Sequence, residues 1–208
     1  MKMERIVLGG DDALIARDRL IKGLDYSADM LKKTLGPGGT NVFLEKKNRV
    51  TNDGVSIAQE IILDDEVENL GAQKIKEICA KVNDEAGDGT TTAATLAQAI
   101  LRECKPKLQK IGELKAPMAP MALVKQVEKE KQEVIELLNK SATKIETEQQ
   151  LIDVATVSVE DPQLGEMIGK TQWAIGPDGH ILVEETTVSE TEIQMIPGIR
   201  IDNGYASS

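Results

Sequence analysis

An acidic, glycine-spaced turn runs directly into three threonines and an Ala-rich segment in the stretch Asp84-Glu-Ala-Gly-Asp-Gly-Thr-Thr-Thr-Ala-Ala-Thr95. Gly87 and Gly89 permit backbone conformations that other residues resist, and Asp88 between them carries a carboxylate suited to a cation. The threonines Thr90-Thr-Thr92 place hydroxyl and N–H groups at the start of an Ala-rich helix, where an anion is favoured. A carboxylate beside a phosphate cradle indicates a bridging divalent metal, so the stretch predicts a nucleotide–Mg²⁺ site. A capped helix start after a tight turn is the simpler alternative.

Composition narrows the classes of protein that fit. The 208 residues suffice for one large or two small domains, and with 40% hydrophobic but only 2% aromatic residues the core must be aliphatic. Few aromatics and a net charge of −10 argue against a nucleic-acid partner, which needs a basic face and stacking platforms. A nucleotide remains compatible with this acidity, because Mg²⁺ and helix N-termini supply local positive charge.

The cysteines and the apolar runs favour a cytoplasmic protein without a membrane partner. Cys79 and Cys104 have neither metal-type nor redox-type spacing, which predicts two reduced thiols within helices. No signal peptide is recognised, and no apolar run approaches the roughly 18 residues that a membrane span needs.

The spacing of apolar residues predicts a mainly α-helical chain with a small α+β part. Steps of three and four residues predict helices over 11–34, 55–61, 64–83, from Thr90 onward, 122–139, 151–158 and from Asp161 onward. Alternation predicts a hairpin from 41–44 and 49–51, an edge strand at 6–8, and strands at 181–184, 192–196 and 199–201. Gly176-Pro-Asp-Gly179 is expected to be a turn.

The same spacing predicts which helix faces are buried. Gly71 within the buried stripe of its helix indicates close approach of a neighbouring helix. The faces expected to be buried in the later helices are Ala93, Ala97, Ile100, Cys104 and Leu108, then Val124, Val127, Val134 and Leu138, and then Leu164, Met167, Ile168, Thr171 and Ile175.

Two further turns lie at helix ends and could join the Asp88 site. Thr34-Leu-Gly-Pro-Gly-Gly39 exposes backbone amides where the first helix stops, as either a plain turn or a phosphate loop. Asp53, in Asn52-Asp-Gly54, precedes a helix and is either its N-cap or a second carboxylate for the site.

In their order and spacing, the three turns Thr34–Pro37, Asn52–Gly54 and Gly87–Thr92 resemble the chaperonins, and more closely the bacterial and organellar type, group I. The resemblance extends over essentially the whole chain, including Glu68-Asn-Leu-Gly-Ala-Gln73 and the turn at 176–179. It implies an equatorial ATP-binding domain over residues 1–139, a first segment of an intermediate hinge domain over 140–195, and the start of an apical domain over 196–208.

The resemblance implies a role for each matching residue. Thr34, Leu35, Gly36 and Pro37 would line the phosphates and ribose of ATP, Asp88 would ligate Mg²⁺, and Gly89, Thr90, Thr91 and Thr92 would cradle the phosphates. Asp53 would be catalytic and would orient or deprotonate the attacking water. K⁺ would be held partly by the backbone carbonyls of Thr34, Asn52 and Thr91.

Departures from the group I pattern accompany these matches. Gly38 stands where members usually have Lys after Gly-Pro, and Asn52 stands where they usually have Lys before Asp-Gly, as in the archaeal and eukaryotic type. The stretch between Leu44 and Thr51 is shorter than usual. Members are also much longer, and the third catalytic carboxylate, which lies on the returning intermediate segment, is not in this chain.

Two functions are therefore open. The first is an ATP-dependent protein-folding chaperone, a subunit that forms rings of identical chains and binds unfolded clients. Whether a cochaperonin also acts as its lid is an open question. ATPase activity is expected of the longer form and is expected to be negligible for this chain alone. The second is a truncated or non-hydrolysing chaperonin-like module that acts as an interaction or structural subunit. A P-loop kinase or GTPase is disfavoured, because no Gly-Lys-Ser/Thr run exists.

Overall fold

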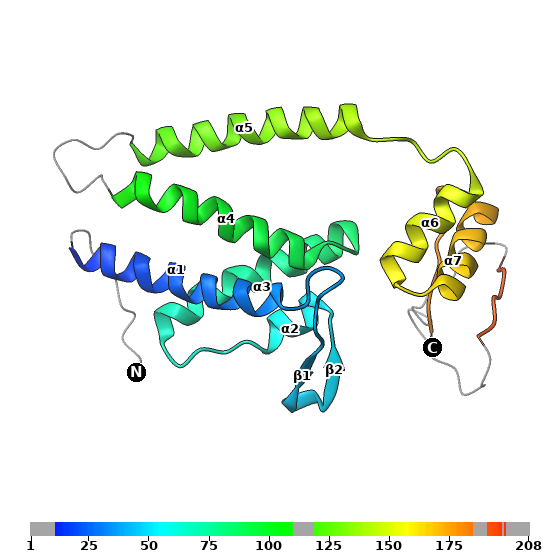
Figure 1. Cartoon of the computed structure of the whole chain (residues 1–208), viewed down its shortest axis with the longest axis horizontal. Helices are drawn as coiled ribbons and strands as arrows, with labels where there is room; N and C mark the ends of the chain where they lie inside the picture. The colour runs from blue at the N-terminus through cyan, green and yellow to red at the C-terminus, as the bar shows by residue number, and fades with distance from the viewer. Residues whose placement is uncertain (1–10, 110–118, 185–190, 197, 199–208) are drawn as a thin grey trace, which may run out of the picture. The chain divides into compact units, whose positions relative to one another are not determined.

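A computed structural model describes residues 11–109, 119–184, 191–196 and 198, although side chains at 11–14 and 108–109 are not described. The chain divides into two compact units, residues 1–140 and 141–208 (Figure 1). The first holds α1 (Asp11–Lys32), β1 (Val42–Leu44), the short 3₁₀ helix η1 (Glu45–Lys47), β2 (Arg49–Thr51), α2 (Gly54–Glu60), α3 (Glu66–Ala86), α4 (Thr90–Gln109) and α5 (Pro120–Ser141). The second holds α6 (Glu148–Val159) and α7 (Pro162–Ile175). The assignment of these parts to equatorial, intermediate and apical domains stays a prediction.

The predicted mainly helical fold with one hairpin is confirmed. The helices begin and end within a few residues of the positions expected from the sequence. β1 and β2 pair antiparallel with Val42 opposite Thr51 and Leu44 opposite Arg49, and the left-handed Asn48 (φ 45°) ends the 3₁₀ turn that joins them. The exposed Phe43 and Val50 face each other across this ladder.

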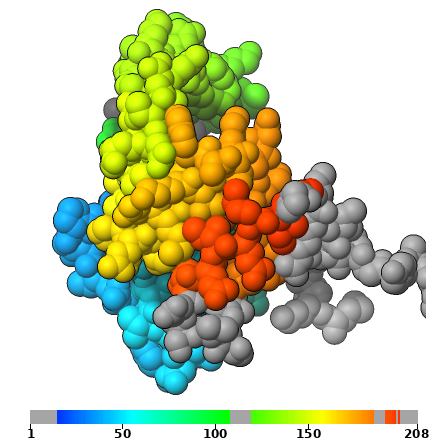
Figure 2. All heavy atoms as spheres, turned by 90° about the vertical axis from the view of Figure 1, so that its right-hand side faces the viewer, coloured from blue at the N-terminus to red at the C-terminus, as the bar shows by residue number. Residues whose placement is uncertain are grey.

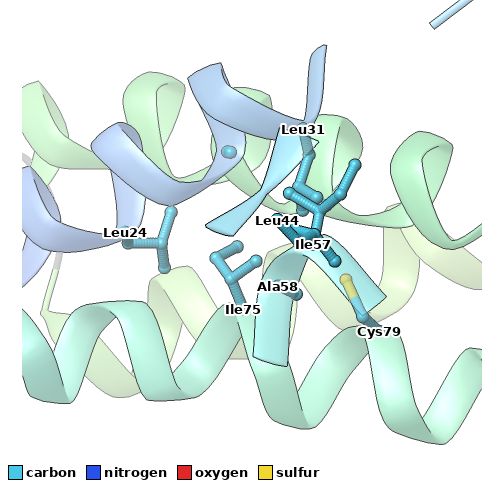
Figure 3. Close-up of a cluster of buried hydrophobic side chains, with 9 residues drawn as sticks. Leu24, Leu31, Leu44, Ile57, Ala58, Ile75 and Cys79 are labelled. Atoms are coloured by element: carbon cyan, nitrogen blue, oxygen red, sulfur yellow. The ribbon is translucent and has the colours of Figure 1, made fainter. Parts of the chain in front are cut away.

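An aliphatic core holds α1, α2, α3 and α4 together with the hairpin (Figure 3). Leu31, Ile57 and Ile75 are almost wholly buried and come from three different helices. The helices α1 and α3 pack so closely that a Cβ added at Gly71 would lie 2.0 Å from the backbone oxygen of Leu20. The prediction that Gly71 marks a close neighbouring helix is therefore confirmed.

The predicted buried face of α4 is wrong by one residue position. Ala94 and Gln98 are fully buried, whereas Ile100 is 42% exposed. On an Ala-rich helix neighbouring stripes are almost equally apolar, so periodicity alone does not select between them. A Gln on the inner face also conceals the pattern, because a buried amide is tolerated once its hydrogen bonds are made. Ala93, Ala97 and Cys104 are half-buried, and the side chain of Leu108 lies outside the described residues.

The predicted buried face of α5 is also largely wrong. Val124, Val134 and Leu138 are exposed, Val127 is half-buried, and Leu123 is buried instead. The hydrophobic spacing is genuine, but most of the side chains that carry it are exposed among the described residues. The Lys and Glu side chains of α5, which were predicted to face outward, are exposed, and Lys131 forms an ion pair with Glu128 one turn before it.

The second unit is a pair of helices in close contact, drawn in yellow and orange (Figure 2). In α7 the buried residues are Gly165 and Gly169, where the backbone of α6 comes very close. A Cβ added at Gly165 would lie 2.4 Å from Thr156 Cα, and one added at Gly169 would lie 2.6 Å from Ile152 Cα. The predicted inner residue Leu164 is wrong, since it is 41% exposed. Small residues replace it at the contact because they let the two backbones approach.

The predicted start and end signals of α7 are confirmed, and α6 begins with a cap that was not predicted. Asp161 caps α7 by accepting hydrogen bonds from the N–H groups of Gln163 and Leu164, and Pro162 occupies the first turn. Gly176, with a positive φ of 82°, ends α7, and Gly179 N–H donates to its carbonyl at 3.2 Å. Thr147 and Gln150 form a reciprocal capping box at the start of α6.

The strands predicted after this turn are wrong where the structure describes them. Residues 181–184 and 191–196 form no strand ladder. Alternation marks a chain suited to a sheet, but a strand needs a partner to satisfy its backbone. The strands predicted at 6–8 and 199–201 lie outside the described residues.

Three smaller expectations concern single residues and membrane spans. Cys79 in α3 and Cys104 in α4 are free cysteines, as predicted, and His180 is exposed. Among the described residues, no helix combines the length and apolarity that crossing a membrane requires.

Candidate functional site

The turn that carries Asp88 is shorter than the sequence indicated. Asp84 belongs to the last turn of α3 rather than to the turn, and Gly87 ends that helix with φ 74° and donates its N–H to Asn83 O at 2.9 Å. Gly89 is also left-handed (φ 84°), and its N–H donates to Asp88 Oδ1 at 2.5 Å. Two glycines with positive φ thus place the exposed Asp88 carboxylate directly before α4.

The threonines occupy the first turn of α4, as predicted. The hydrogen-bond ladder of this helix begins with Ala93 N–H donating to Gly89 O at 2.9 Å. The N–H groups of Thr90, Thr91 and Thr92 therefore stand ahead of the first ladder bond, where helices bind anions. Exposure rises along the three side chains, from buried Thr90 through half-buried Thr91 to exposed Thr92.

Asp53 is the N-cap of α2, which confirms the structural alternative for this residue. Its carboxylate accepts from Val55 N–H at 3.3 Å, from Ser56 N–H at 3.0 Å and from Ser56 Oγ at 2.5 Å. A carboxylate offers about four acceptor positions, so capping leaves about one of them for another donor. The side chain is exposed. Capping and the orientation of a water are thus compatible, and the catalytic role stays a prediction.

Gly54 brings the Asp53 turn against the first turn of α4. A Cβ added at Gly54 would lie 2.5 Å from Thr90 Oγ1 and 2.7 Å from Thr91 Oγ1. A larger residue there would force the threonine hydroxyls or one of the two helices to move. Segments nearly forty residues apart in the sequence therefore meet at one place, with a carboxylate-bearing turn on one side and the threonines on the other.

The buried thiol of Cys79 lies beneath this junction. Its Sγ donates to the backbone carbonyl of Thr90 at 3.8 Å. Burial raises the pKa of the thiol to about 11, and the negative charge of Asp53 adds to the rise. Cys79 is therefore a neutral packing residue under α4 and not a nucleophile or a metal ligand.

The Thr34–Pro37 turn is held by the last carbonyls of α1. Thr34 donates to Leu31 O from both its N–H (3.0 Å) and its Oγ1 (2.9 Å), and Gly36 adopts a left-handed φ of 74°. Leu35 and Pro37 are exposed. A Cβ added at Gly38 meets nothing within 4 Å, so the lysine usual in group I members would fit at this position.

The arrangement fits an anion with a metal better than a metal alone. Among the described residues, no group of three or more His, Cys, Asp or Glu side chains is placed to hold a metal ion. Mg²⁺ is commonly held by one or two carboxylates, with phosphate oxygens and water completing its shell. Asp88 beside the threonine amides meets that requirement. Asn52 is exposed at the start of the Asp53 turn.

Sequence reasoning missed two residues near this site. Gly54 was treated only as part of a turn, although an Asp-Gly pair at a helix start signals either a turn or a close approach of another backbone. Gln98 was missed because polar residues are normally assigned to the surface.

The helical fold is that of a chaperonin. The structure aligns with a crystal structure of the chaperonin gp146 from bacteriophage EL 2 (Pseudomonas aeruginosa) in presence of ATP-BeFx, with a TM-score of 0.64 and 26% sequence identity. The match covers 78% of this chain and 28% of that chain, so the chain spans well under half of the relative.

The family follows from the sequence match. The model of the TCP-1/cpn60 chaperonin family matches residues 28–208. The chain therefore belongs to the TCP-1/cpn60 chaperonin family, and the predicted chaperonin resemblance is confirmed. The closer assignment to group I and the individual roles of the site residues stay predictions.

Proposed function

We propose that this chain binds Mg–ATP where α2 meets the first turn of α4, and that it serves an ATP-dependent protein-folding chaperonin. The single observation that carries the proposal is the contact of Gly54 with Thr90 and Thr91, which joins two turns that the sequence had marked separately. Membership of the chaperonin family and a relative crystallised with ATP-BeFx support the choice of nucleotide.

The α4 turn binds the phosphates in this proposal. The N–H groups and hydroxyls of Gly89, Thr90, Thr91 and Thr92 donate to phosphate oxygens, and the helix dipole adds to the attraction. The Thr34–Pro37 turn lines the phosphates and ribose. The Asp88 carboxylate holds Mg²⁺, which neutralises charge on the phosphates when bound.

Asp53 orients the water that attacks the terminal phosphate. Its cap bonds hold the carboxylate in one orientation, which lowers the entropic cost of positioning a water. K⁺ is coordinated partly by the backbone carbonyls of Thr34, Asn52 and Thr91. Asn52 in place of the usual Lys removes a charge but keeps the carbonyl, so this contact does not depend on the side chain.

Client and subunit contacts belong to the same proposal. A chaperonin role implies rings of identical subunits and unfolded clients in the cytoplasm. The matched relative is far longer than this chain, so ring assembly and client release are proposed for the complete assembly.

A nucleotide titration of this chain with and without Mg²⁺ tests the site. The unaltered chain is expected to bind ATP more tightly with Mg²⁺, and Asp88→Asn is expected to remove that difference. Asp84→Asn is the matched control, because it removes the same charge from an exposed carboxylate on the preceding turn of α3. Equal affinity with and without Mg²⁺ in the unaltered chain would contradict the proposal.

Asp53→Asn separates the cap from the catalytic role. Asn caps helices about as well as Asp, so the variant should keep its fold and its nucleotide affinity. In an assembly that hydrolyses ATP, turnover should fall by about 10²- to 10⁴-fold, as for loss of a positioned base. Unchanged turnover would leave Asp53 as a cap only.

The alternative function, a non-hydrolysing interaction or structural subunit, is favoured by one observation. The apolar residues of α5 that remain exposed include Met121, Val124, Leu137 and Leu138, and an exposed apolar face is typical of interaction surfaces. Steady ATP hydrolysis by this chain alone would exclude this alternative.

A further inference from the structure

Gln98 is a fully buried polar residue in α4 whose amide is bonded to α1 on both sides. Its Nε2 donates to Asp25 O at 3.2 Å and to Asp29 Oδ1 at 2.9 Å, and its Oε1 accepts from the ammonium group of Lys32. Arg102, one turn further along α4, donates to Asp25 Oδ1 at 3.0 Å and to Asp29 Oδ2 at 3.4 Å. All hydrogen-bonding groups of the buried amide are thus engaged.

These hydrogen bonds restrict the sliding of α4 along its own axis relative to α1, which the apolar contacts restrict only weakly. The face of α4 toward the core is rich in small alanines, such as Ala94, which offer little steric resistance to sliding along the helix axis. Hydrogen bonds are directional and weaken steeply when distance or angle changes. The Gln98 amide is therefore the buried part of a set of directional contacts between α4 and α1 that also includes Arg102 and the partly exposed ion pair of Lys105 with Asp18 at 3.1 Å.

Both candidate nucleotide turns extend directly from the parts that this network joins. Lys32 is the last residue of α1, and its carbonyl accepts from Leu35 N–H at 3.1 Å. The backbone carbonyl of the next residue, Lys33, accepts from Thr40 N–H at 2.8 Å. In α4, Gln98 lies about 12 Å along the same helix from Thr90, at the usual rise of 1.5 Å per residue. The register of the two helices thus sets the distance between the Thr34–Pro37 turn and the threonines.

We propose that Gln98 and Lys32 are positioning residues that hold the Thr34–Pro37 turn at the correct place relative to the α4 phosphate cradle. The inference rests on the proposed function for its effect on nucleotide, but its structural part does not. Neither residue contacts the nucleotide, and both act through the turn and the helix that do.

Hydrogen exchange without nucleotide tests the positioning itself. In Gln98→Leu, exchange at the bonded amides of Leu35, Gly39 and Thr40 should rise about tenfold relative to the core amides of α3, the size typical of a network residue that couples two elements. Ile21→Ala is the control: it removes a buried apolar group of α1 outside the network, so it should lower stability without changing that ratio. An unchanged ratio in Gln98→Leu would overturn the proposal.

Lys32→Met keeps the test decisive if Gln98→Leu fails to fold. The Lys32 side chain is one-third exposed, so its loss is tolerated more easily, and it breaks the same contact. The ratio should rise in this variant too. If Lys32→Met exchanges like the unaltered chain, the pair does not hold the turn.

Titration with Mg–ADP then tests the link to nucleotide. Gln98→Leu and Lys32→Met should each weaken binding about tenfold, and the double variant should be no weaker than the worse single variant, because both remove one contact. Additive losses, or affinities equal to that of Ile21→Ala, would overturn the proposal. If the unaltered chain binds no Mg–ADP while the exchange ratio still rises in the variants, the proposed function fails and the positioning of the turn stands.

Discussion

The α1–α4 body and the α6–α7 pair hold together in different ways. In the body, side chains such as Leu31, Ile57 and Ile75 are almost wholly buried. In the described α6 and α7, the buried residues are Gly165 and Gly169, so backbones rather than large side chains make the contact. Burial of apolar area is the main stabilising term in folding. The body is therefore expected to be the stable support of the candidate site, and the pair to open at lower free energy.

The largest expected effect tests whether burial, rather than hydrophobic pattern, stabilises the body. Ile75→Ala in α3 should lower the free energy of unfolding by about 2–5 kcal/mol, because it leaves a cavity among packed helices. Leu138→Ala in α5 is the matched change on a side chain that is 64% exposed, and it should cost no more than about 0.5 kcal/mol. Urea denaturation measures both. A comparable loss in Leu138→Ala would mean that the apolar face of α5 is covered.

The second prediction concerns the glycine contact of the pair. Gly165→Ala places a methyl group 2.2 Å from Thr156 Oγ1 and should cost the α6–α7 pair about 1–3 kcal/mol through overpacking. Gly38→Ala, whose methyl group would meet nothing within 4 Å, is the control. Hydrogen exchange should show faster opening in α6 and α7 only. Equal loosening of α1–α4 would break the comparison between the two units.

A smaller effect is expected from the capping box of α6. Thr147→Ala removes the hydroxyl that accepts from Gln150 N–H at 3.3 Å, and it should cost about 1 kcal/mol. Thr143→Ala, at an exposed position in the preceding segment, is the control and should be neutral. Proteolysis of the α6 region reports the difference. A neutral Thr147→Ala would show that packing with α7 alone determines the stability of α6.

The smallest expected effect is a pH dependence in the body. Asp65 caps α3 and pairs with Arg19, and the Glu68 N–H bond followed by the Arg19 contacts holds the pKa of its carboxyl below the usual 3.8. A depressed pKa contributes stability above the usual value, and that contribution disappears as pH falls through the folded value. Asp65→Asn keeps the cap but loses the charge. Its melting temperature should therefore fall below that of the unaltered chain at about pH 7, with the gap closing as the pH falls below the usual carboxyl pKa of 3.8 and through the lower folded value. A constant gap would contradict the role of the charge.

Local signals predicted much of the fold and part of the candidate site. The sequence pairs Asp161-Pro162 and Asp53-Gly54 marked helix starts, and Gly71 marked a close approach of two helices, whereas the end of α3 at Gly87 lies a few residues beyond the predicted end at 83. Each of the confirmed signals depends on the conformation of a few neighbouring residues, which is why a single sequence reveals it. The strands predicted at 181–184 and 192–196 failed because a ladder also needs a second segment.

The order of helices, the caps and the turn chemistry around Asp88 were thus dictated by local sequence, because propensity and capping act within a few residues. Tertiary packing alone decided that Ala94 and Gln98 rather than Ile100 face the core, and that Gly54 meets Thr90 and Thr91. Those outcomes depend on segments tens of residues apart, whose mutual contacts leave no periodic trace in either segment.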